Sequence, residues 1–462
     1  MRPAVAAIVL AAGQGTRFRS DLAKVLHRAA GRSLVGHVLE AVRPLGLGQV
    51  VVVVGHQADD VAAEVAAAEV PGLTTVLQAE QRGTGHAVQQ AVPALRQEIE
   101  RVMILNGDSP HLTTPWLERL LEDATGRGGG MLTARMGDPT GYGRVLRDAE
   151  GTVSGIVEER DATPEQRRVT EINAGMYVFE RGGLEAALAG LRGDNEQGEL
   201  YLTDVVGALA EQGRPVAATA TPPEVVAGVN DRLQLAEAAA TLRRVHLRRL
   251  MTEVGVSVTD PATTYVDVDV TVGRDAVLLP GTILEEGTTV GPRAVVGPNS
   301  HLTRCRIGEG ATVHSTRAVD AEVGEGASVG PFAHLRAGTR LGPATKVGAY
   351  VETKNATLGA GSKAPHLAYL GDATVGTDVN VACGVITVNY DGETKSHTTI
   401  EDDAFVGCDT MLVAPVTIGR GAYTAAGSTI TDDVPPDALA IARSRQSVKD
   451  GWAARHRGVS TT

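Results

Sequence analysis

The sequence predicts a two-part α/β protein, with a sheet-and-helix domain up to about residue 228 and a parallel β-helix over residues 251–440. Three observations predict this architecture. Short apolar runs alternate with helix-like stretches in the first half of the chain. Aliphatic residues recur at every sixth position in the second half. Between the halves, residues 229–250 have the composition of one exposed helix, which would link the two domains.

Length and composition fit a large protein of the cytoplasm. At 462 residues the chain is too long for a single hydrophobic core. Its net charge of -12 argues against general nucleic-acid binding. The longest apolar run, near residues 4–12, is far shorter than the ~20 residues that cross a bilayer, so no membrane insertion is expected. Only three cysteines occur, which favours a reducing compartment over a disulfide framework.

In the first half, four short apolar runs predict buried parallel strands, at residues 5–12, 49–55, 74–78 and 101–108. Helix-like stretches lie between them, for example at residues 34–42 and 58–68. This alternation predicts a Rossmann-like sheet with helices on both faces. Ligands of such sheets bind at the carboxyl ends of the strands, where the segments LAAGQGTR, LQAEQRGTG and LNGDSP fall.

The second half has a hydrophobic period of six, and glycine often follows the repeating residue. The repeating positions are Val272, Leu278, Leu284, Val290, Val296, Leu302, Ile307, Val313, Val319, Val323, Val329, Leu335, Leu341, Val347, Ile400, Val406, Leu412, Ile418 and Ile430, with Thr424 in one slot. This period fits a triangular coil in which each short strand points one side chain inward. We predict a left-handed parallel β-helix of hexapeptide repeats, against the alternative of an irregular β domain rich in glycine and valine. Between Leu358 and Ile400 the period breaks, and we expect a loop there.

The glycine-rich turn LAAGQGTRF follows the first predicted strand. Phe18 stands where the dinucleotide fingerprint has its third glycine, and no Gly-Lys pair of a Walker A loop occurs. The turn still offers backbone N–H groups for phosphate oxygens, and Arg17 and Lys24 add two cations. Taken alone, the turn is as compatible with a structural role as with phosphate binding.

Further short segments accompany the glycine-rich turn. The first half carries LAAGQGTRF, SDLAKVL, LQAEQRGTGHA, NGDSP, GYGR, GIVEERDAT, EINAG and GVNDRLQL. The second half carries PFAHLRAGTRL, VGAYVETKNATLGAGSKAPHLAYLGDA, VNYDGETK and LVAPVTIG. In order and spacing, these segments resemble the bacterial family that makes UDP-N-acetylglucosamine with uridylyltransferase and acetyltransferase domains in one chain. The resemblance covers nearly the whole chain. It implies a nucleotidyltransferase domain over residues 1–228, a helical linker over 229–250, a left-handed β-helix acetyltransferase domain over 251–440 and a basic tail over 441–462.

For uridylyl transfer, the resemblance implies that UTP reacts with N-acetylglucosamine-1-phosphate and releases pyrophosphate. Both reactants are anions, so cations must neutralise the charge that develops. The family pattern assigns this role to Arg17, Lys24 and a Mg²⁺ ion held by Asp108 and Asn230. By themselves, Asp108 could be a turn cap and Asn230 a helix N-cap. The implied nucleotide and sugar contacts are Leu10, Ala11, Ala12, Gly13, Lys24, Gln78, Gly83, Thr84, Asn106, Gly107, Asp108, Gly143, Glu158, Asn173 and Asn230. Among these, the resemblance implies that Gln78 reads the uracil base. It also implies that Gly143, Glu158 and Asn173 contact the sugar.

For acetyl transfer, the resemblance implies that acetyl-CoA reacts with the amine of glucosamine-1-phosphate. Such an amine is partly protonated at neutral pH, so a general base is needed, and histidine suits this task. A lone histidine in a loop is usually only solvated, but the matched motif makes His366 the expected base. The implied sugar-phosphate contacts are Arg336, Lys354, Tyr369 and Asn380. The implied acetyl-CoA contacts are Cys383, Asn389, Tyr390, Cys408, Ala426 and Arg443.

Two cysteines depart from the family pattern. Cys408 stands where serine is common, and Cys383 stands where a small alanine is usual. A thiol is a weak hydrogen-bond donor, so the serine's contribution to thioester binding is in doubt. We expect thiol alkylation to impair acetyl transfer and to spare uridylyl transfer.

The resemblance also implies a homotrimer with acetyl-transfer sites between subunits. The basic tail would suit the phosphates of coenzyme A, although a solvated tail beyond residue 452 is the alternative. Two other functions are weighed: a nucleotidyltransferase whose β-helix only regulates, as in relatives that make ADP-glucose, and an inactive scaffold. The intact set of Arg17, Lys24, Asp108, Lys354 and His366 argues against both.

Overall fold

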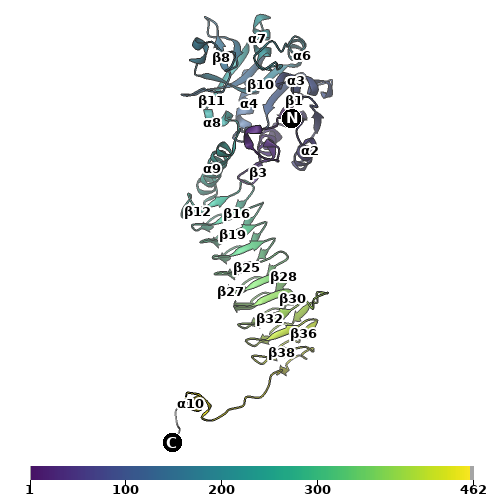
Figure 1. Cartoon of the computed structure of the whole chain (residues 1–462), viewed down its shortest axis with the longest axis vertical. Helices are drawn as coiled ribbons and strands as arrows, with labels where there is room; N and C mark the ends of the chain where they lie inside the picture. Colours follow the sequence, from purple (N-terminus) through teal and green to yellow (C-terminus); the bar gives the residue numbers. More distant parts are fainter. Residues whose placement is uncertain (1, 458–462) are drawn as a thin grey trace. The chain divides into compact units, whose positions relative to one another are not determined.

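The computed structural model describes residues 2–457, and the last residues of the predicted basic tail lie outside that range. The chain divides into two compact units, Met1–Leu242 and Arg243–Thr462. The boundary between them falls within the predicted connecting helix, which is α9 (Arg232–Arg249) (Figure 1).

A mixed sheet forms the centre of the first unit. Its strands, in the order β11-β7-β10-β6-β1-β4-β5, are β11 (Val216–Thr221), β7 (Gly129–Arg135), β10 (Glu171–Glu180), β6 (Arg101–Asn106), β1 (Arg2–Ala11), β4 (Leu47–Val54) and β5 (Leu73–Leu77). The four predicted strands are confirmed as β1, β4, β5 and β6, which pair in parallel. However, β5 lies at the edge of the sheet and leaves Leu77 55% exposed, so this strand is not buried on both faces as predicted.

Within this seven-strand order, β10 runs against the other six strands. β10 pairs antiparallel with both β6 and β7, and it also pairs with a hairpin made of β8 (Arg144–Arg147) and β9 (Val153–Val157). The apolar pattern did not predict this reversal, because a strand's direction depends on how the chain connects to it. A small second sheet pairs β2 (Arg28–Ala29) with β3 (Arg32–Ser33).

Helices cover both faces of the sheet, as predicted. The helices of this unit before α9 are α1 (Leu34–Val42), α2 (Ala58–Ala67), α3 (Thr84–Ala91), α4 (Thr114–Asp123), α5 (Pro164–Arg167), α6 (Arg181–Ala189), α7 (Asp204–Glu211) and α8 (Pro223–Val226). Apolar residues of α1, α2 and α4 pack with one face of β1, and those of α3, α6 and α7 pack with its other face. α1 begins at Ser33, whose hydroxyl accepts a hydrogen bond from the Gly36 amide at 3.1 Å.

The second unit is a parallel β-helix with three strands per turn. Each strand generally pairs with the third strand after it, so successive coils stack on three faces (Figure 1). The first face consists of β12 (Ser257–Val258), β15 (Val277–Leu278), β18 (Val295–Val296), β21 (Thr312–Val313), β24 (Ser328–Val329), β27 (Lys346–Ala349), β29 (Lys363–His366), β31 (Asn380–Val381), β34 (Phe405–Val406), β37 (Tyr423–Thr424) and β39 (Leu439–Ala440).

The other two faces share two long strands, β28 (Glu352–Leu358) and β30 (Tyr369–Val375), which bend from one face to the next. The second face also holds β13 (Tyr265–Val266), β16 (Ile283–Glu285), β19 (His301–Thr303), β22 (Arg317–Val319), β25 (His334–Leu335), β32 (Ile386–Val388), β35 (Met411–Val413) and β38 (Thr429–Ile430). The third face also holds β14 (Thr271–Val272), β17 (Thr289–Val290), β20 (Arg306–Ile307), β23 (Glu322–Val323), β26 (Arg340–Leu341), β33 (Thr398–Ile400) and β36 (Val416–Ile418).

The predicted six-residue positions form the core of the coil, with one exception. Val319 is only half-buried, and Ala318, which is 1% exposed, takes the inward place opposite Leu302 and Leu335. The coil is shorter there, so counting six residues from Val313 overshoots the inward position by one. Thr424 is confirmed in its slot, where its hydroxyl accepts a hydrogen bond from the Gly407 amide at 3.0 Å.

The predicted break between Leu358 and Ile400 is largely wrong. The β-helix continues through it, and the inward slots that the aliphatic pattern missed hold three aliphatic residues, one alanine and one threonine. These inward residues are Ala364, Leu370, Val375, Val381 and Thr387. Only residues 389–397 leave the coil as a loop. His366 therefore ends strand β29 rather than lying in a loop.

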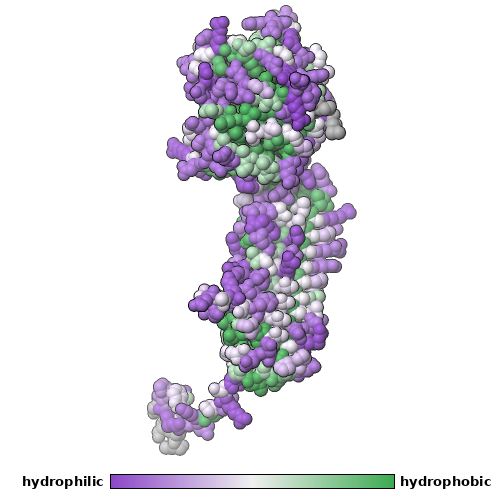
Figure 2. Space-filling model, turned by 90° about the vertical axis from the view of Figure 1, so that its right-hand side faces the viewer, coloured by the Kyte–Doolittle hydropathy of each residue, from purple (hydrophilic) through white to green (hydrophobic). Residues whose placement is uncertain are grey.

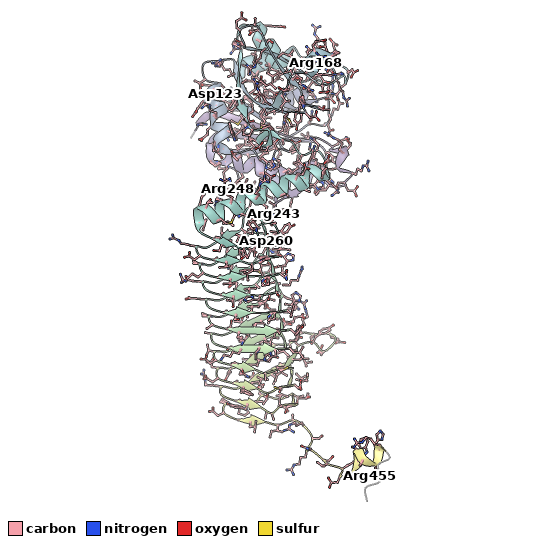
Figure 3. All side chains as sticks on the ribbon, turned by 90° about the vertical axis from the view of Figure 1, so that its left-hand side faces the viewer. Asp123, Arg168, Arg243, Arg248, Asp260 and Arg455 are labelled. Atoms are coloured by element: carbon pink, nitrogen blue, oxygen red, sulfur yellow. The ribbon has the colours of Figure 1, made fainter. Side chains whose placement is uncertain are left out.

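Both ends of the coil carry helical segments. α9, which carries Arg243 (Figure 3), runs into a π-helical turn, Leu250–Val254, before the first coil. The Arg243 guanidinium lies over the Tyr265 ring, 4.1 Å from the ring centre. After the last coil, an exposed segment leads to the short helix α10 (Trp452–His456), which carries Arg455 (Figure 3).

Candidate active sites

A cavity of about 310 Å³ lies at the carboxyl ends of β1 and β6 in the first unit. Nine of the predicted nucleotide-site residues line it: Leu10, Ala12, Gly13, Lys24, Gln78, Gly83, Thr84, Asn106 and Asp108. Val25, Gln81, Ala87 and Glu199 also line it and were not predicted. Gln81 donates a hydrogen bond to the Ala12 carbonyl at 2.6 Å, so it anchors the glycine-rich turn.

Lys24 is the centre of a polar network at this cavity. Its ammonium forms an ion pair with Asp108, and it donates a hydrogen bond to Asn230 Oδ1 at 3.0 Å. Arg17 donates to the same Asn230 oxygen at 2.9 Å. The side chains of Lys24 and Asp108 are only 15% and 20% exposed, so their charges are partly shielded from water. The structure thus brings together the four residues that the sequence assigned to phosphate and metal binding.

The oxygen atoms of this network are suitable ligands for a divalent cation. Asp108 and Asn230 direct oxygen atoms at one ammonium group, and hard oxygen ligands of this kind suit Mg²⁺. Among residues 2–457, no three acidic, histidine or cysteine side chains gather to form a metal cage. Because Mg²⁺ takes one or two protein ligands with phosphate and water oxygens, a two-residue site agrees with its chemistry.

The backbone near Asp108 is held independently of its side chain. The Asp108 carbonyl accepts a hydrogen bond from the Val229 amide at 2.9 Å, so the segments that carry Asp108 and Asn230 lie side by side. The Gly107 amide donates to the Leu10 carbonyl at 2.9 Å, and a Cβ at Gly107 would also lie 2.9 Å from that oxygen. Glycine is therefore required for this close approach.

The predicted base-reading residue, Gln78, is buried and already held in place. Its amide nitrogen lies 3.2 Å from the Gly83 carbonyl oxygen and 3.1 Å from His86 Nδ1. These contacts fix the orientation of its amide group at the cavity wall. His86 was not predicted, because nothing in the local pattern distinguishes it from an ordinary helix residue.

The three predicted sugar contacts lie close to one another. The Asn173 amide donates to the Gly143 carbonyl at 2.8 Å, and a Cβ at Gly143 would meet the Glu158 carboxylate at 3.4 Å. Burial raises the pKa of Glu158, and the charges of Asp161 and Asp204 raise it further. Asn106, on the nucleotide cavity, donates to the Ala174 carbonyl at 3.3 Å, which connects that cavity to the strand of Asn173.

In the β-helix, one edge aligns the predicted base with three predicted acetyl-CoA contacts. We call this edge, which contains the turn at Leu367, the first corner. The strand register places His366, Cys383, Cys408 and Ala426 at equivalent positions in four successive coils. Hydrogen bonds of 2.8 Å from the Gly384, Asp409 and Gly427 amides to the carbonyls of the preceding coil hold this alignment. Arg443 lies next to it, with its Cδ 3.8 Å from a Cβ built on Gly427.

A second group of predicted residues lies at the next corner of the coil, which contains the turn at Asp372. We call it the second corner. Arg336 and Lys354 occupy adjacent coils there, and Arg336 forms an ion pair with Glu352 at 2.9 Å. Lys395, from the 389–397 loop, lowers the pKa of Lys354 by hydrogen bonding and repulsion. Three cations gathered in this way favour a bound anion.

The structure separates some residues that the sequence grouped together. Asn389 donates to Asp372 at 2.5 Å, so it lies at the second corner, apart from Cys383. Tyr390 follows it in the loop, where its hydroxyl donates to the Gly392 carbonyl at 2.5 Å. Tyr369 starts the strand between the two corners, and Asn380 pairs with Lys363 on the first face.

Fold and sites together define a class of protein: a nucleotidyltransferase domain joined to a hexapeptide-repeat transferase domain. The MobA-like NTP transferase domain matches residues 7–195, and the bacterial transferase hexapeptide (six repeats) matches residues 397–432. Two similar curated proteins, both called Bifunctional protein GlmU, are from Streptomyces avermitilis and Corynebacterium glutamicum. The first is 51% identical over 99% of this chain and 95% of its own length. The second is 48% identical over 98% of this chain and 94% of its own length.

The chain belongs to the GlmU family. It is a bifunctional enzyme of UDP-N-acetylglucosamine synthesis that combines a uridylyltransferase with an acetyltransferase. In the described part of the chain, no helix has the length and apolar character needed to cross a membrane.

Proposed function

We propose that this chain transfers uridylyl groups at the Lys24 network and acetyl groups along the edges of its β-helix. Acetyl-CoA and glucosamine-1-phosphate would react first, and UTP would then react with the N-acetylglucosamine-1-phosphate that forms. The observation that best supports the proposal is the convergence of Asp108, Asn230 and Arg17 around Lys24 at a cavity walled by the glycine-rich turn.

In uridylyl transfer, the main task of the protein is to hold two anionic reactants in line. The backbone of residues 10–13 and the cations of Arg17 and Lys24 bind the phosphates of UTP. Gln78 holds the uracil, and the group of Gly143, Glu158 and Asn173 orients the sugar. Asp108 and Asn230 would hold Mg²⁺, which neutralises charge on the phosphate oxygens when it is bound. Lys24 would then exchange its ion pair with Asp108 for contacts to phosphate.

In acetyl transfer, the imidazole of His366 removes a proton from the sugar ammonium, which frees the lone pair that attacks the thioester carbon. The amide forms, and coenzyme A leaves as a thiol. Cys383, Cys408 and Ala426 lie along the same edge as His366, and this alignment supports placing the thioester beside them. Arg336, Lys354 and Lys395 would bind the sugar phosphate.

The His366 group and the Lys354 group lie at different corners of the same β-helix, which supports a homotrimer. A site that uses both groups at once is built more simply from the first corner of one chain and the second corner of another. The domain division at residues 228, 250 and 440 and a location in the cytoplasm remain predictions, to be tested by expressing the separate parts and by cell fractionation.

Subunit complementation tests the shared site. His366→Ala and Lys354→Ala chains should each lose acetyl transfer, because each lacks one half of the site. Coexpressed chains should regain part of the activity, since mixed trimers contain intact sites. Activity in mixtures no greater than the sum of the two single variants would contradict the shared site. Uridylyl transfer, measured on the same samples, controls for folding and concentration.

A further inference from the structure

Cys383 and Cys408 lie one coil apart at the first corner. Val381 and Val406, each two residues earlier, are paired in register, and the Asp409 amide donates to the Cys383 carbonyl at 2.8 Å. Cys408 is exposed and Cys383 is half-buried, and both are free thiols. The third cysteine, Cys305, lies in another coil and is 1% exposed.

The spacing of these two thiols suits a disulfide. Neighbouring strands of a sheet lie about 4.8 Å apart, so aligned Cα atoms of adjacent coils have about this separation. Disulfides join residues whose Cα atoms are roughly 4.4–6.8 Å apart. Both cysteines occupy the outward-facing corner and not the apolar core of the coil, so their sulfur atoms need not cross packed side chains to meet.

We propose that Cys383 and Cys408 form a reversible disulfide under peroxide, and that this bond switches off acetyl transfer while uridylyl transfer continues. The effect on activity rests on the proposed position of acetyl-CoA along the first corner. Closing the bond pulls both side chains away from that position and removes two thiols that would face the thioester.

The chemistry needs only a peroxide as oxidant. The exposed Cys408 sulfur attacks one peroxide oxygen, which breaks the O–O bond, and gives a sulfenic acid and water. The Cys383 sulfur then attacks the sulfenic sulfur and displaces the oxygen as a second water molecule. Two thiols lose two electrons and two protons in total, and hydrogen peroxide is reduced to two waters. A dithiol such as dithiothreitol reverses the reaction by thiol–disulfide exchange.

Peptide mapping tests the bond itself. Trypsin cuts after Lys363, Lys395 and Arg420, so each cysteine lies in its own peptide, 364–395 or 396–420. After treatment of the full chain with hydrogen peroxide, these two peptides should appear joined, at the mass of the pair less two hydrogens. Dithiothreitol should separate them. The Cys305→Ser variant should form the same joined pair, whereas Cys383→Ser should not. If wild-type peptides 364–395 and 396–420 stay separate after oxidation, the proposal is wrong.

Activity measurements test the switch. Acetyl transfer by the wild type should fall at least ~10-fold on oxidation, since displacements of about 1 Å near a reacting group can have effects of this size. It should recover with dithiothreitol, and uridylyl transfer should stay unchanged. Cys383→Ser and Cys408→Ser are each compared with their own reduced activity, and neither should show the full reversible fall. A joined peptide pair with undiminished acetyl transfer would refute the switch and the placement of acetyl-CoA, but would leave the bond and the uridylyl site intact.

Discussion

Replacing Asp108 by asparagine tests the uridylyltransferase site most directly. The substitution keeps the shape of the side chain and removes its charge, so Lys24 loses its ion-pair partner and the proposed Mg²⁺ loses its only anionic protein ligand. The backbone should stay in place, because the Val229 amide binds the Asp108 carbonyl and not its side chain. Removing one preorganised polar group from a shielded site typically lowers kcat by about 100- to 1,000-fold, or about 3–4 kcal/mol. We expect a loss of this size in pyrophosphate release from UTP and N-acetylglucosamine-1-phosphate.

The second activity of the chain provides the control. Acetyl transfer from acetyl-CoA to glucosamine-1-phosphate, measured by the release of the coenzyme A thiol, should be unchanged in Asp108→Asn. The residues proposed for acetyl transfer belong to the other compact unit. Asp60→Asn, which removes an exposed carboxylate from α2, should leave both activities unchanged. The Mg²⁺ concentration for half-maximal uridylyl transfer should rise in Asp108→Asn alone. Retention of more than about a tenth of wild-type uridylyl transfer, or an equal loss of both activities, would refute the assignment.

Three further predictions follow from the structure. Burial lowers the pKa of His37 from 6.5 to about 4, so the unfolded chain binds a proton that the folded chain resists. The free energy of unfolding of the first unit should therefore fall by up to about 3 kcal/mol as the pH drops from 6.5 to 4. Trp116 fluorescence would follow the unfolding. The His37→Gln variant should lose most of this pH dependence, whereas His56→Gln should keep it. Lys395→Ala should raise the KM for glucosamine-1-phosphate about fivefold and leave kcat unchanged, and the rise in KM should be smaller at high salt. An equal rise in KM for Lys346→Ala would contradict a specific role of Lys395 in binding the sugar phosphate. Arg144→Lys should raise the KM for N-acetylglucosamine-1-phosphate roughly 10-fold. The buried Arg144 guanidinium donates hydrogen bonds to the Tyr142 carbonyl and to Glu159, so it positions the segment beside the sugar contacts. An unchanged KM would argue against this positioning role.

Much of the fold could be predicted because burial leaves a regular trace in the sequence. Four parallel strands and two helices of the first unit follow from apolar runs, and the β-helix follows from one inward residue in every six. The reversed strand β10 left no such trace, since a buried strand has the same composition in either direction. The pattern also failed where inward residues are not aliphatic. Thr387 fills an inward slot and accepts a hydrogen bond from the Gly371 amide at 2.8 Å, so a polar side chain is tolerated there.

The two candidate sites differ in how far the sequence could predict them. At the nucleotide cavity, strand ends of a parallel sheet meet at one edge, so the sequence alone predicts that Asp108 and the glycine-rich turn lie close together. The contribution of Gln81 was not foreseen, because it acts by holding the Ala12 carbonyl from a separate loop.

In the β-helix, the six-residue period reports only which side chains point inward. Which outward residues share a corner depends on the length of every intervening coil, and these lengths vary: the pairing of Ile283 with His301 encloses a longer coil than that of Arg306 with Glu322. The alignment of His366 with Cys383 and Cys408, and the distance of this group from Lys354 along the coil, therefore appear only in the strand register. Figure 2 shows hydrophobic residues gathered at the far end of the β-helix. Leu439 in the last strand and Ile441 just after it are both exposed, so this end carries apolar side chains on its surface. Acetyl-CoA has an apolar arm and a charged nucleotide end. The arm would contact the apolar end of the β-helix, and the nucleotide phosphates would contact the basic tail that carries Arg443. This argument predicts that shortening the chain after residue 441 weakens acetyl-CoA binding more than it slows the acetyl-transfer step, and a fall in kcat without a rise in KM would contradict it.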